Sequence, residues 1–424
     1  MAPKHPSHPP RDASLPVSLW LGAVLVGASL SLIGVAALAP RILESLALPP
    51  TAIGVFFAVV WSSALLTATA GGPLVARWGA WGLSRACPLL CAAGLVAVIA
   101  GEPWLFWVGA VLIGLGQGIE TPPSSHLLGH HVPPAKRPLY FSLKQSGVQV
   151  GAVIASLALP AIAIAWGWRA ALVATIAALL ALAATLGTPA RRHPAPDAPR
   201  AAASGLRTLL HWARPLRRRP GLMRLVIAAS AFGATQICLN SFLVTWGVRE
   251  RGLDLAGAGL LAAAAQGAGV LARPLWGWVA THAGGTRAVL GGLGIVMAAC
   301  GLLLGLFGTR MPMALLAPLA ACYGLSASGW NGVFLAEVAS RAAPDQVAST
   351  SSAAMVPLFL ALVLGPLAFA AVGGVAGLGA GFVAIAAGSV AGGGLRPGGR
   401  GEGGAPPAVG ARPRLPRGPR PAGG

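Results

Sequence analysis

The stretch VSLWLGAVLVGASLSLIGVAALA, residues 17–39, contains no charged residue and is long enough to cross a lipid bilayer. A helix needs about 20 apolar residues to span the hydrocarbon core. The rest of the chain repeats this pattern, because hydrophobic residues make up 55% of its 424 residues and charged ones only 9%. A soluble protein needs more charge to cover its surface. The composition therefore indicates an integral membrane protein.

Twelve such stretches lie along the chain, six on each side of a basic, proline-rich segment. Helices are the expected structure, because barrel strands alternate polar and apolar residues and these stretches do not. The predicted fold class is an all-α membrane protein with two pseudo-symmetric six-helix bundles. The predicted spans are 17–39, 52–75, 86–101, 104–127, 139–165, 169–188, 222–247, 256–280, 288–308, 312–337, 350–371 and 374–393. The last span is the weakest, since it is mostly Ala and Gly.

The prediction divides the chain into five parts. Two bundles, 17–188 and 222–393, are joined by a basic linker, 189–221. Residues 1–16 are polar and rich in proline, and residues 394–424 are almost wholly Gly, Pro, Arg and Ala. Both segments are predicted to be disordered, because such compositions cannot build a packed core.

The formal net charge of +20 is distributed unevenly. Basic residues crowd the linker, with a run at Arg217, Arg218 and Arg219, and they also occupy the alternate loops on the same side. This positive-inside bias places both termini and the linker in the cytoplasm, and we expect a bacterial cytoplasmic membrane. Nucleic-acid binding is not expected, because the basic residues are not interleaved with aromatic ones. Contact with anionic lipid headgroups accounts for the charge.

The two halves of the chain repeat one another. Gly72-Pro-Leu-Val-Ala-Arg77-Trp-Gly79 ends the second span, and Gly277-Trp-Val-Ala-Thr-His282-Ala-Gly284 ends the eighth. Gly114 and Gly324 begin similar stretches of the fourth and tenth spans. Duplicated bundles are typical of secondary transporters, whose substrate binds near the membrane midplane between the repeats.

On these features the chain resembles the major facilitator superfamily over nearly all of residues 17–390. The resemblance rests on the six-plus-six spans, the long middle loop, and the turn containing Gly72, Arg77 and Gly79. It implies alternating access, with cytoplasmic gate loops at that turn and at Arg273 and Gly277.

The resemblance is incomplete at two places. Members of the family usually carry an acid before the basic residue of the turn, where this chain has Ala76 and Thr281. Drug/proton antiporters of the family carry a Gly-Pro followed by paired Gly in the fifth span, whereas residues 142–151 read SLKQSGVQVG. The chain more closely resembles permeases for small organic anions, with efflux of amphipathic compounds as the alternative. Gly147 and Gly151 form a face suited to close helix contact.

Ionisable residues within spans are costly and usually face the interior or a cavity. Glu120 shares a helical face with Gln117, and Lys144 and Gln145 lie near the start of the next span. A Glu120–Lys144 ion pair is predicted, in which Lys144 is passed to an anionic substrate and Glu120 carries a proton. A fixed ion pair with no role in transport is the alternative.

Further polar residues lie in the second half. Gln236 and Asn240 are one turn apart in the seventh span, and Asn331 lies in the tenth. They are candidates for lining the substrate cavity, although hydrogen bonding between helices explains each one equally well. Glu337 precedes Arg341 by four residues, which is a favourable structural pair.

A membrane enzyme with a histidine-ligated metal is the remaining alternative. His126, His130 and His131 resemble one box of such enzymes, but those enzymes need several boxes and the other histidines form no second cluster. The five cysteines lie within spans, where packing is their expected role. The sequence therefore predicts a monomeric transporter, not an enzyme, that binds a small-molecule substrate and membrane lipids, with H+ as the candidate coupling ion and no cofactor or metal.

Overall fold

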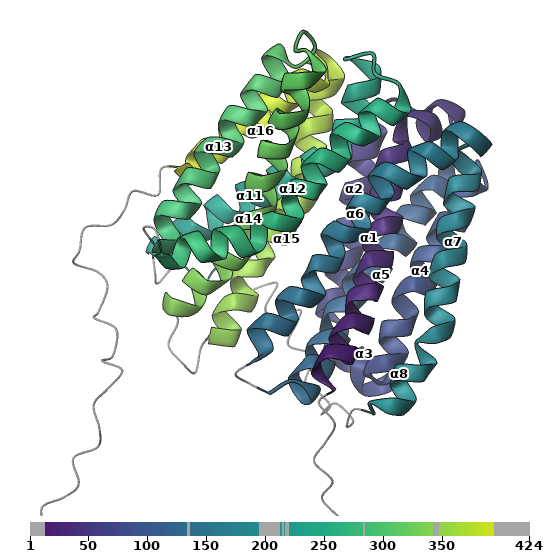
Figure 1. Cartoon of the computed structure of the whole chain (residues 1–424), viewed down its shortest axis with the longest axis vertical. Helices are drawn as coiled ribbons and strands as arrows, with labels where there is room; N and C mark the ends of the chain where they lie inside the picture. Colours follow the sequence, from purple (N-terminus) through teal and green to yellow (C-terminus); the bar gives the residue numbers. More distant parts are fainter. Residues whose placement is uncertain are drawn as a thin grey trace, which may run out of the picture.

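The computed structural model describes residues 13–133, 136–194, 213, 216, 220–282, 285–341 and 347–393. Every regular element in these ranges is a helix, and the helices form two bundles, drawn purple to blue and teal to yellow in Figure 1. The first bundle contains α1 (Ser14–Ser45), α2 (Ala52–Thr69), α3 (Gly71–Trp78), α4 (Ala80–Ile99), α5 (Pro103–His131), α6 (Arg137–Trp166), α7 (Trp168–Thr185) and α8 (Gly187–Arg192). The second contains α11 (Pro220–Arg249), α12 (Leu255–His282), α13 (Gly285–Phe307), α14 (Met313–Arg341), α15 (Val347–Ala376) and α16 (Leu378–Gly393).

The predicted spans correspond to these helices. Eleven described helices are long and apolar enough to cross a membrane, and the apolar part of α16, Leu378–Val390, is shorter. The predicted disorder of residues 394–424 and of residues 1–12, and most of the linker, lie outside the described residues. The first helix begins at Ser14, slightly before its predicted start.

One predicted boundary is wrong. The span 52–75 is divided into α2, which ends at Thr69, and the short helix α3, so that α4 already begins at Ala80. The sequence at the break is Gly71-Gly72-Pro73. Paired glycines destabilise a helix interior, and proline can donate no backbone hydrogen bond.

The internal repeat is visible in the helix contacts. In the first bundle α1 packs on α6, α2 on α5, α4 on α5, and α4 on α7. The corresponding helices of the second bundle make the same four contacts, which are α11 with α15, α12 with α14, α13 with α14, and α13 with α16. The bundles meet through α2 against α15, α6 against α12 and α1 against α11. Because this arrangement maps each half onto the other, the repeat predicted from the sequence is a repeat of structure.

Equivalent glycines make equivalent helix contacts. A Cβ atom added at Gly114 of α5 would collide with the carbonyl oxygen of Val60 in α2. One added at Gly324 of α14 would collide with the carbonyl oxygen of Ala265 in α12. Only a residue without a side chain allows these backbones to approach so closely.

A glycine with positive φ lies at the start of both α4 and α13. Gly79 has φ +71° between α3 and α4, and Gly285 has φ +82° at the start of α13. This left-handed conformation strains any residue with a Cβ atom. The tight connection predicted from the Gly72–Gly79 motif is therefore present in the first half, whereas residues 283 and 284 of its counterpart lie outside the described residues.

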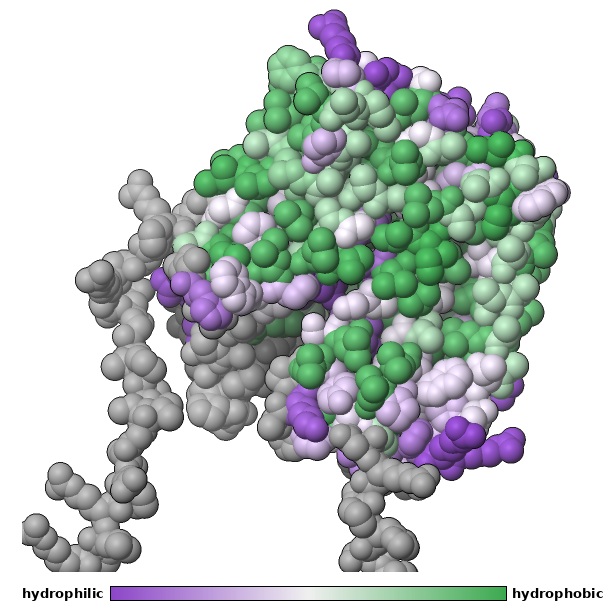
Figure 2. All heavy atoms as spheres, viewed as in Figure 1, coloured by the Kyte–Doolittle hydropathy of each residue, from purple (hydrophilic) through white to green (hydrophobic). Residues whose placement is uncertain are grey.

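The outer surface suits a hydrocarbon environment. Many large apolar side chains face outward, among them Val375 at 92% exposure and Trp166 at 75%. On the face drawn in Figure 2, hydrophobic residues cover the middle and the most hydrophilic ones gather at the two ends. An apolar surface of this extent would be unfavourable in water, and it is the surface expected of a bilayer-spanning protein.

Candidate functional site

Glu120 and Lys144 form a buried ion pair in the first bundle. Glu120 lies on α5 and Lys144 on α6, and each is 3% exposed. The Lys144 Nζ atom lies 3.0 Å from Glu120 Oε1 and donates a 3.3 Å hydrogen bond to Oε2 and a 2.7 Å hydrogen bond to Ser124 Oγ. The pairing predicted from the sequence is therefore confirmed. Ser124 lies one turn after Glu120 on the same face of α5, and its hydroxyl is the second hydrogen-bond partner of the Lys144 ammonium.

The two oxygens of Glu120 are not equivalent. Oε2 accepts a hydrogen bond from Lys144, whereas Oε1 is close to the ammonium without a hydrogen-bonded partner. Oε1 is nevertheless the oxygen closer to the ammonium, so the ion pair compensates its charge. Its lone pairs keep the capacity to receive a proton.

A central cavity of about 590 Å³ lies between the two bundles. Its walls come from α1, α2, α5 and α6 of the first bundle and from α11 and α15 of the second. The lining residues are Leu25, Ser29, Leu32, Ile33, Trp61, Ala64, Leu65, Ala68, Thr69, Gln117, Gly118, Glu120, Thr121, Pro122, Gln145, Val148, Gln149, Ala152, Ile237, Asn240, Met355, Val356 and Phe359. A volume of this size is typical of small-molecule binding sites.

Four residues predicted from the sequence line this cavity: Gln117, Glu120, Gln145 and Asn240. Lys144 does not line it, because its ammonium lies between Glu120 and Ser124. Among the described lining residues, Glu120 alone carries an ionisable side chain. As far as the structure describes it, the cavity wall therefore offers one carboxylate and no cation.

The amide side chains have distinct partners. Gln117 donates a 2.7 Å hydrogen bond to the carbonyl oxygen of Ala28 in α1. Asn240 accepts a 2.7 Å hydrogen bond from Gln266 of α12, so its oxygen is occupied. Gln149 is 2% exposed, and its Nε2 atom has no hydrogen-bond partner. Sequence reasoning missed Gln149 and Gln266, although Gln149 follows Gln145 by one helical turn, which was an available signal.

Gln236 and Asn331 are not brought to the cavity. Gln236 is half-buried on α11, one turn before Asn240, and Asn331 is half-buried on α14. Neither is among the residues that line the central cavity. No residue of α14 lines the cavity over the described part of the chain, and on α11 the lining residues are Ile237 and Asn240 instead of Gln236. A role of Gln236 and Asn331 in substrate binding stays a prediction.

The predicted gate residues lie at the linker-side ends of their helices. Gly72 and Arg77 belong to α3, where Arg77 is exposed, and Gly79 ends that helix. Gly277 lies within α12 near its end at His282. Arg273 is partly buried one turn earlier, and its Nε atom has no hydrogen-bond partner.

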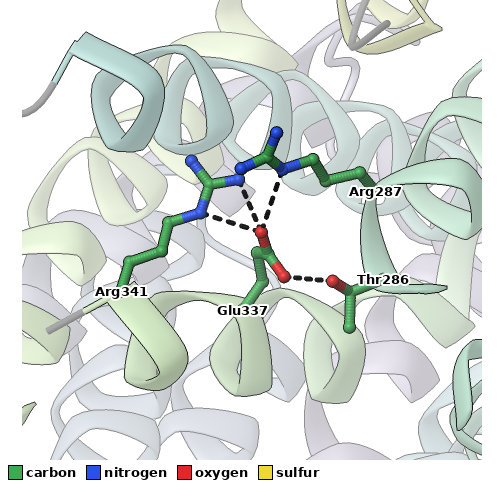
Figure 3. Close-up of polar contacts among 4 residues, drawn as sticks. All are labelled: Thr286, Arg287, Glu337 and Arg341. Atoms are coloured by element: carbon green, nitrogen blue, oxygen red, sulfur yellow. Dashed lines mark hydrogen bonds and ion pairs between the residues drawn. The ribbon is translucent and has the colours of Figure 1, made fainter. Parts of the chain in front are cut away.

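A charged cluster joins α13 and α14 at the same end of the second bundle. Figure 3 shows Thr286, Arg287 and Arg341 directed at the carboxylate of Glu337. Arg341 Nε donates to Glu337 Oε1 at 2.8 Å, and Arg287 Nε does so at 3.2 Å. Glu337 lies beyond the apolar span Met313–Leu335. Burial raises the pKa of Glu337, but hydrogen bonds from Thr286 and the two arginines outweigh burial and hold that pKa below its ordinary value.

Three histidines lie near one another at the end of α5. The rings of His130 and His131 are 4.7 Å apart, and His193 lies 6.0 Å from His131. Within the described part of the chain, no three histidine, cysteine or carboxylate residues are grouped as metal ligands. His130 and His131 instead end α5.

Two repeated bundles of membrane-spanning helices around a central cavity define the class of membrane transporters. A family model for the Major Facilitator Superfamily matches residues 19–366. The chain belongs to the major facilitator superfamily, and the family and the fold indicate a transporter rather than an enzyme.

Solved structures share this fold at low sequence identity. A peptide transporter POT in complex with sulfate aligns with a TM-score of 0.73 and 15% identity, covering 89% of this chain and 92% of that one. A bacterial homologue of the human lysosomal transporter Spinster, in an inward-facing and unoccupied conformation, aligns with a TM-score of 0.68 and 18% identity over 91% and 93% of the two chains.

A curated relative matches a shorter stretch. The multidrug resistance protein MdtH of Escherichia coli is 39% identical over 88 residues, which is 20% of this chain. The match spans only 22% of the MdtH chain. A protein of the same name from Shigella boydii matches to the same extent.

Proposed function

We propose that the protein is a secondary active transporter that moves a small amphipathic cation in exchange for protons. The observation that carries the proposal is the single ionisable side chain, Glu120, among the described residues of the cavity wall. Glu120 presents the negative side of its ion pair with Lys144 to a largely apolar cavity, where its attraction for a positive group is screened less than in water.

The rest of the wall suits the non-ionic part of such a solute. Trp61 and Phe359 face each other across the two bundles with ring centroids 6.2 Å apart. Both line the cavity beside Met355, an adaptable apolar side chain. Gln145 and Gln149 add amide groups that can bind polar substituents.

Exchange follows from competition for one group. Glu120 Oε1 can receive a proton or approach a cationic substrate, but a protonated carboxyl no longer attracts a positive charge. Binding of protons and binding of substrate therefore exclude one another, which is the requirement for antiport. The 2.7 Å hydrogen bond from Lys144 to Ser124 supplies the ammonium with a second partner besides Glu120.

The short likeness to a multidrug resistance protein supports a substrate of this class, although it covers 20% of this chain. The organic anion favoured by the sequence is the second candidate. Lys144 is the cation it would require, and Lys144 would first have to leave Glu120 and Ser124.

The cavity opens toward one membrane face. The bundles touch at Gly54 against Pro366 and at Gly259 against Ser156, all in the halves of their helices remote from the linker. Thr69 at the linker-side end of α2 and Pro122 in the linker-side half of α5 line the cavity. With the linker in the cytoplasm, this is an inward-open arrangement.

Reporter fusions test the orientation. A reporter in the linker and one in the 247–256 loop should lie on opposite sides of the membrane, and finding both on the same side would refute this orientation.

Proteoliposomes with an acidic lumen test the proposal. They should accumulate radiolabelled benzyltrimethylammonium in exchange for protons, and benzenesulfonate serves as a permanently charged anion with the same ring. Glu120→Gln should abolish the exchange, whereas Glu102→Gln, which changes an exposed acid remote from the cavity, should not. Uptake of the anion alone would establish the second candidate, and uptake of neither above protein-free vesicles would refute both.

A further inference from the structure

A second hollow lies on the outside of the second bundle, between α11, α15 and α16. It has a volume of about 450 Å³ and shares no lining residue with the central cavity. Ile227 and Leu364 on its walls are 56% and 59% exposed, so the hollow opens toward the surrounding hydrocarbon.

The walls of this outer groove offer nothing to a polar ligand. Among the described residues that line it, Ser230 alone has a polar side chain. The Ser230 hydroxyl donates a 2.8 Å hydrogen bond to the carbonyl oxygen of Val226 in its own helix. The groove is therefore suited to a hydrocarbon chain, which needs no hydrogen bond.

Small residues create the groove. A Cβ atom added at Gly388 of α16 would lie 4.0 Å from its nearest neighbour on another helix, the Cβ atom of Ala231, so space is left open there. The floor is closed by Phe369, which is fully buried and stacks on Phe242 at 4.0 Å. Along α15 the lining runs from Pro357 to Val372, a helical rise of about 22 Å. That length exceeds one half of a hydrocarbon core of about 30 Å, so it accommodates the acyl chain of one leaflet.

A positive charge marks one end of the groove. Arg224 lies three residues before Ile227 on the same face of α11, and it is exposed. Within the described residues it makes no ion pair or hydrogen bond with the protein. Because α11 begins here, Arg224 lies at the linker-side membrane surface, where phospholipid phosphates are found.

We propose that the outer groove binds one acyl chain of an anionic phospholipid, with the lipid phosphate at Arg224. The groove supplies the shape and the apolar wall, and Arg224 selects the headgroup by charge. This binding does not depend on which solute the protein transports.

Photo-crosslinking tests the proposal on the full-length protein in dodecylmaltoside micelles. Phosphatidylglycerol carrying a diazirine on its acyl chain should label peptides of α11, α15 and α16. Phosphatidylcholine with the same tail should label them about fivefold less. This ratio corresponds to the attraction of ~1 kcal/mol between one basic residue and an anionic membrane surface. Equal labelling by the two lipids would overturn the headgroup assignment.

Variants locate the bound chain. Ala368→Phe and Ala384→Phe each place a ring in the groove from an exposed position, and both should reduce the labelling severalfold. Arg224→Gln should remove the preference for phosphatidylglycerol. Ala178→Phe adds the same ring at an exposed position of α7 and should change nothing. Unchanged labelling in both groove variants, each checked for folding by gel filtration, or an equal loss in Ala178→Phe, would refute the groove as the binding site.

Discussion

At the scale of single residues, the Glu120–Lys144 pair makes a stability prediction. Lys144→Met leaves the Glu120 carboxylate buried without its countercharge, and breaking a buried pair in this way costs about 3–5 kcal/mol. Adding Glu120→Gln removes the unpaired charge and should recover most of the loss. Thermal unfolding in detergent compares the two variants. A double variant as unstable as Lys144→Met would show that the ion pair is not the source of the loss.

Glu337 makes a prediction about pH at the same scale. Its pKa is lowered in the folded protein, so the folded state binds the proton more weakly than the unfolded state does. The resulting stabilisation is present above the ordinary pKa of a glutamate and is lost as the pH falls through the lowered value. Glu337→Gln should therefore lose stability at neutral pH and show a flatter acid dependence. Unfolding temperatures recorded from neutral to acidic pH measure both effects, and parallel curves would contradict them.

At the scale of helices, Glu250 holds the start of the short helix α16. Its carboxylate accepts hydrogen bonds from the backbone N–H groups of Leu378 and, at 3.0 Å, of Gly379. Hydrogen bonds to a charged group contribute about 1.5–3 kcal/mol, and a negative charge also suits a helix N-terminus. Glu250→Gln should speed hydrogen exchange in the first turn of α16. Glu102→Gln is the matched control, because Glu102 precedes α5 without a side-chain capping bond, and equal changes in both variants would refute the role of Glu250.

Helix packing gives a second prediction at this scale. Gly151 of α6 packs on the Val26 carbonyl oxygen of α1, and Gly147 packs on Gly22 in the same way, as their spacing predicted. Gly151→Ala should destabilise the protein because α1 must move away. Gly82→Ala on α4 adds its Cβ to open space and should be neutral or stabilising by up to about 1 kcal/mol. Thermal unfolding distinguishes the two, and equal shifts would contradict the packing argument.

At the scale of the whole molecule, transport requires the two bundles to separate where they now touch. Thr51 at the start of α2 lies beside Gly374 of α15, with its Cγ2 atom 3.6 Å from the site of the glycine's missing Cβ. A disulfide between Thr51→Cys and Gly374→Cys should stop transport in proteoliposomes, and a reductant should restore it. Each single variant should remain active. Full transport by the crosslinked protein would mean that this contact does not open during the cycle.

The sequence identified the charged residues that the membrane forces to find a partner. An unpaired charge in hydrocarbon is so unfavourable that Glu120 and Lys144, on consecutive spans, were expected to pair, and they do. It did not show that Lys144 lies behind Glu120 instead of in the cavity wall. That depends on how α5 and α6 are rotated against each other, and helical spacing alone does not specify this rotation.

The sequence by itself determined the membrane environment, the helical structure, the two repeated halves and the glycine contacts between helices. These follow from local composition and period, because lipid forces each span to satisfy its own backbone hydrogen bonds. Only the tertiary structure decided that Gln149 and Gln266 join the polar groups at the bundle interface while Asn331 does not. It also placed Arg224 one helical turn before an apolar groove that α11 forms with the distant pair α15 and α16. The neutral amides Gln149, Gln266 and Asn331 can each be accommodated at several positions with little cost in free energy. Packing between helices therefore decides where they lie, and the chemistry of any one segment does not.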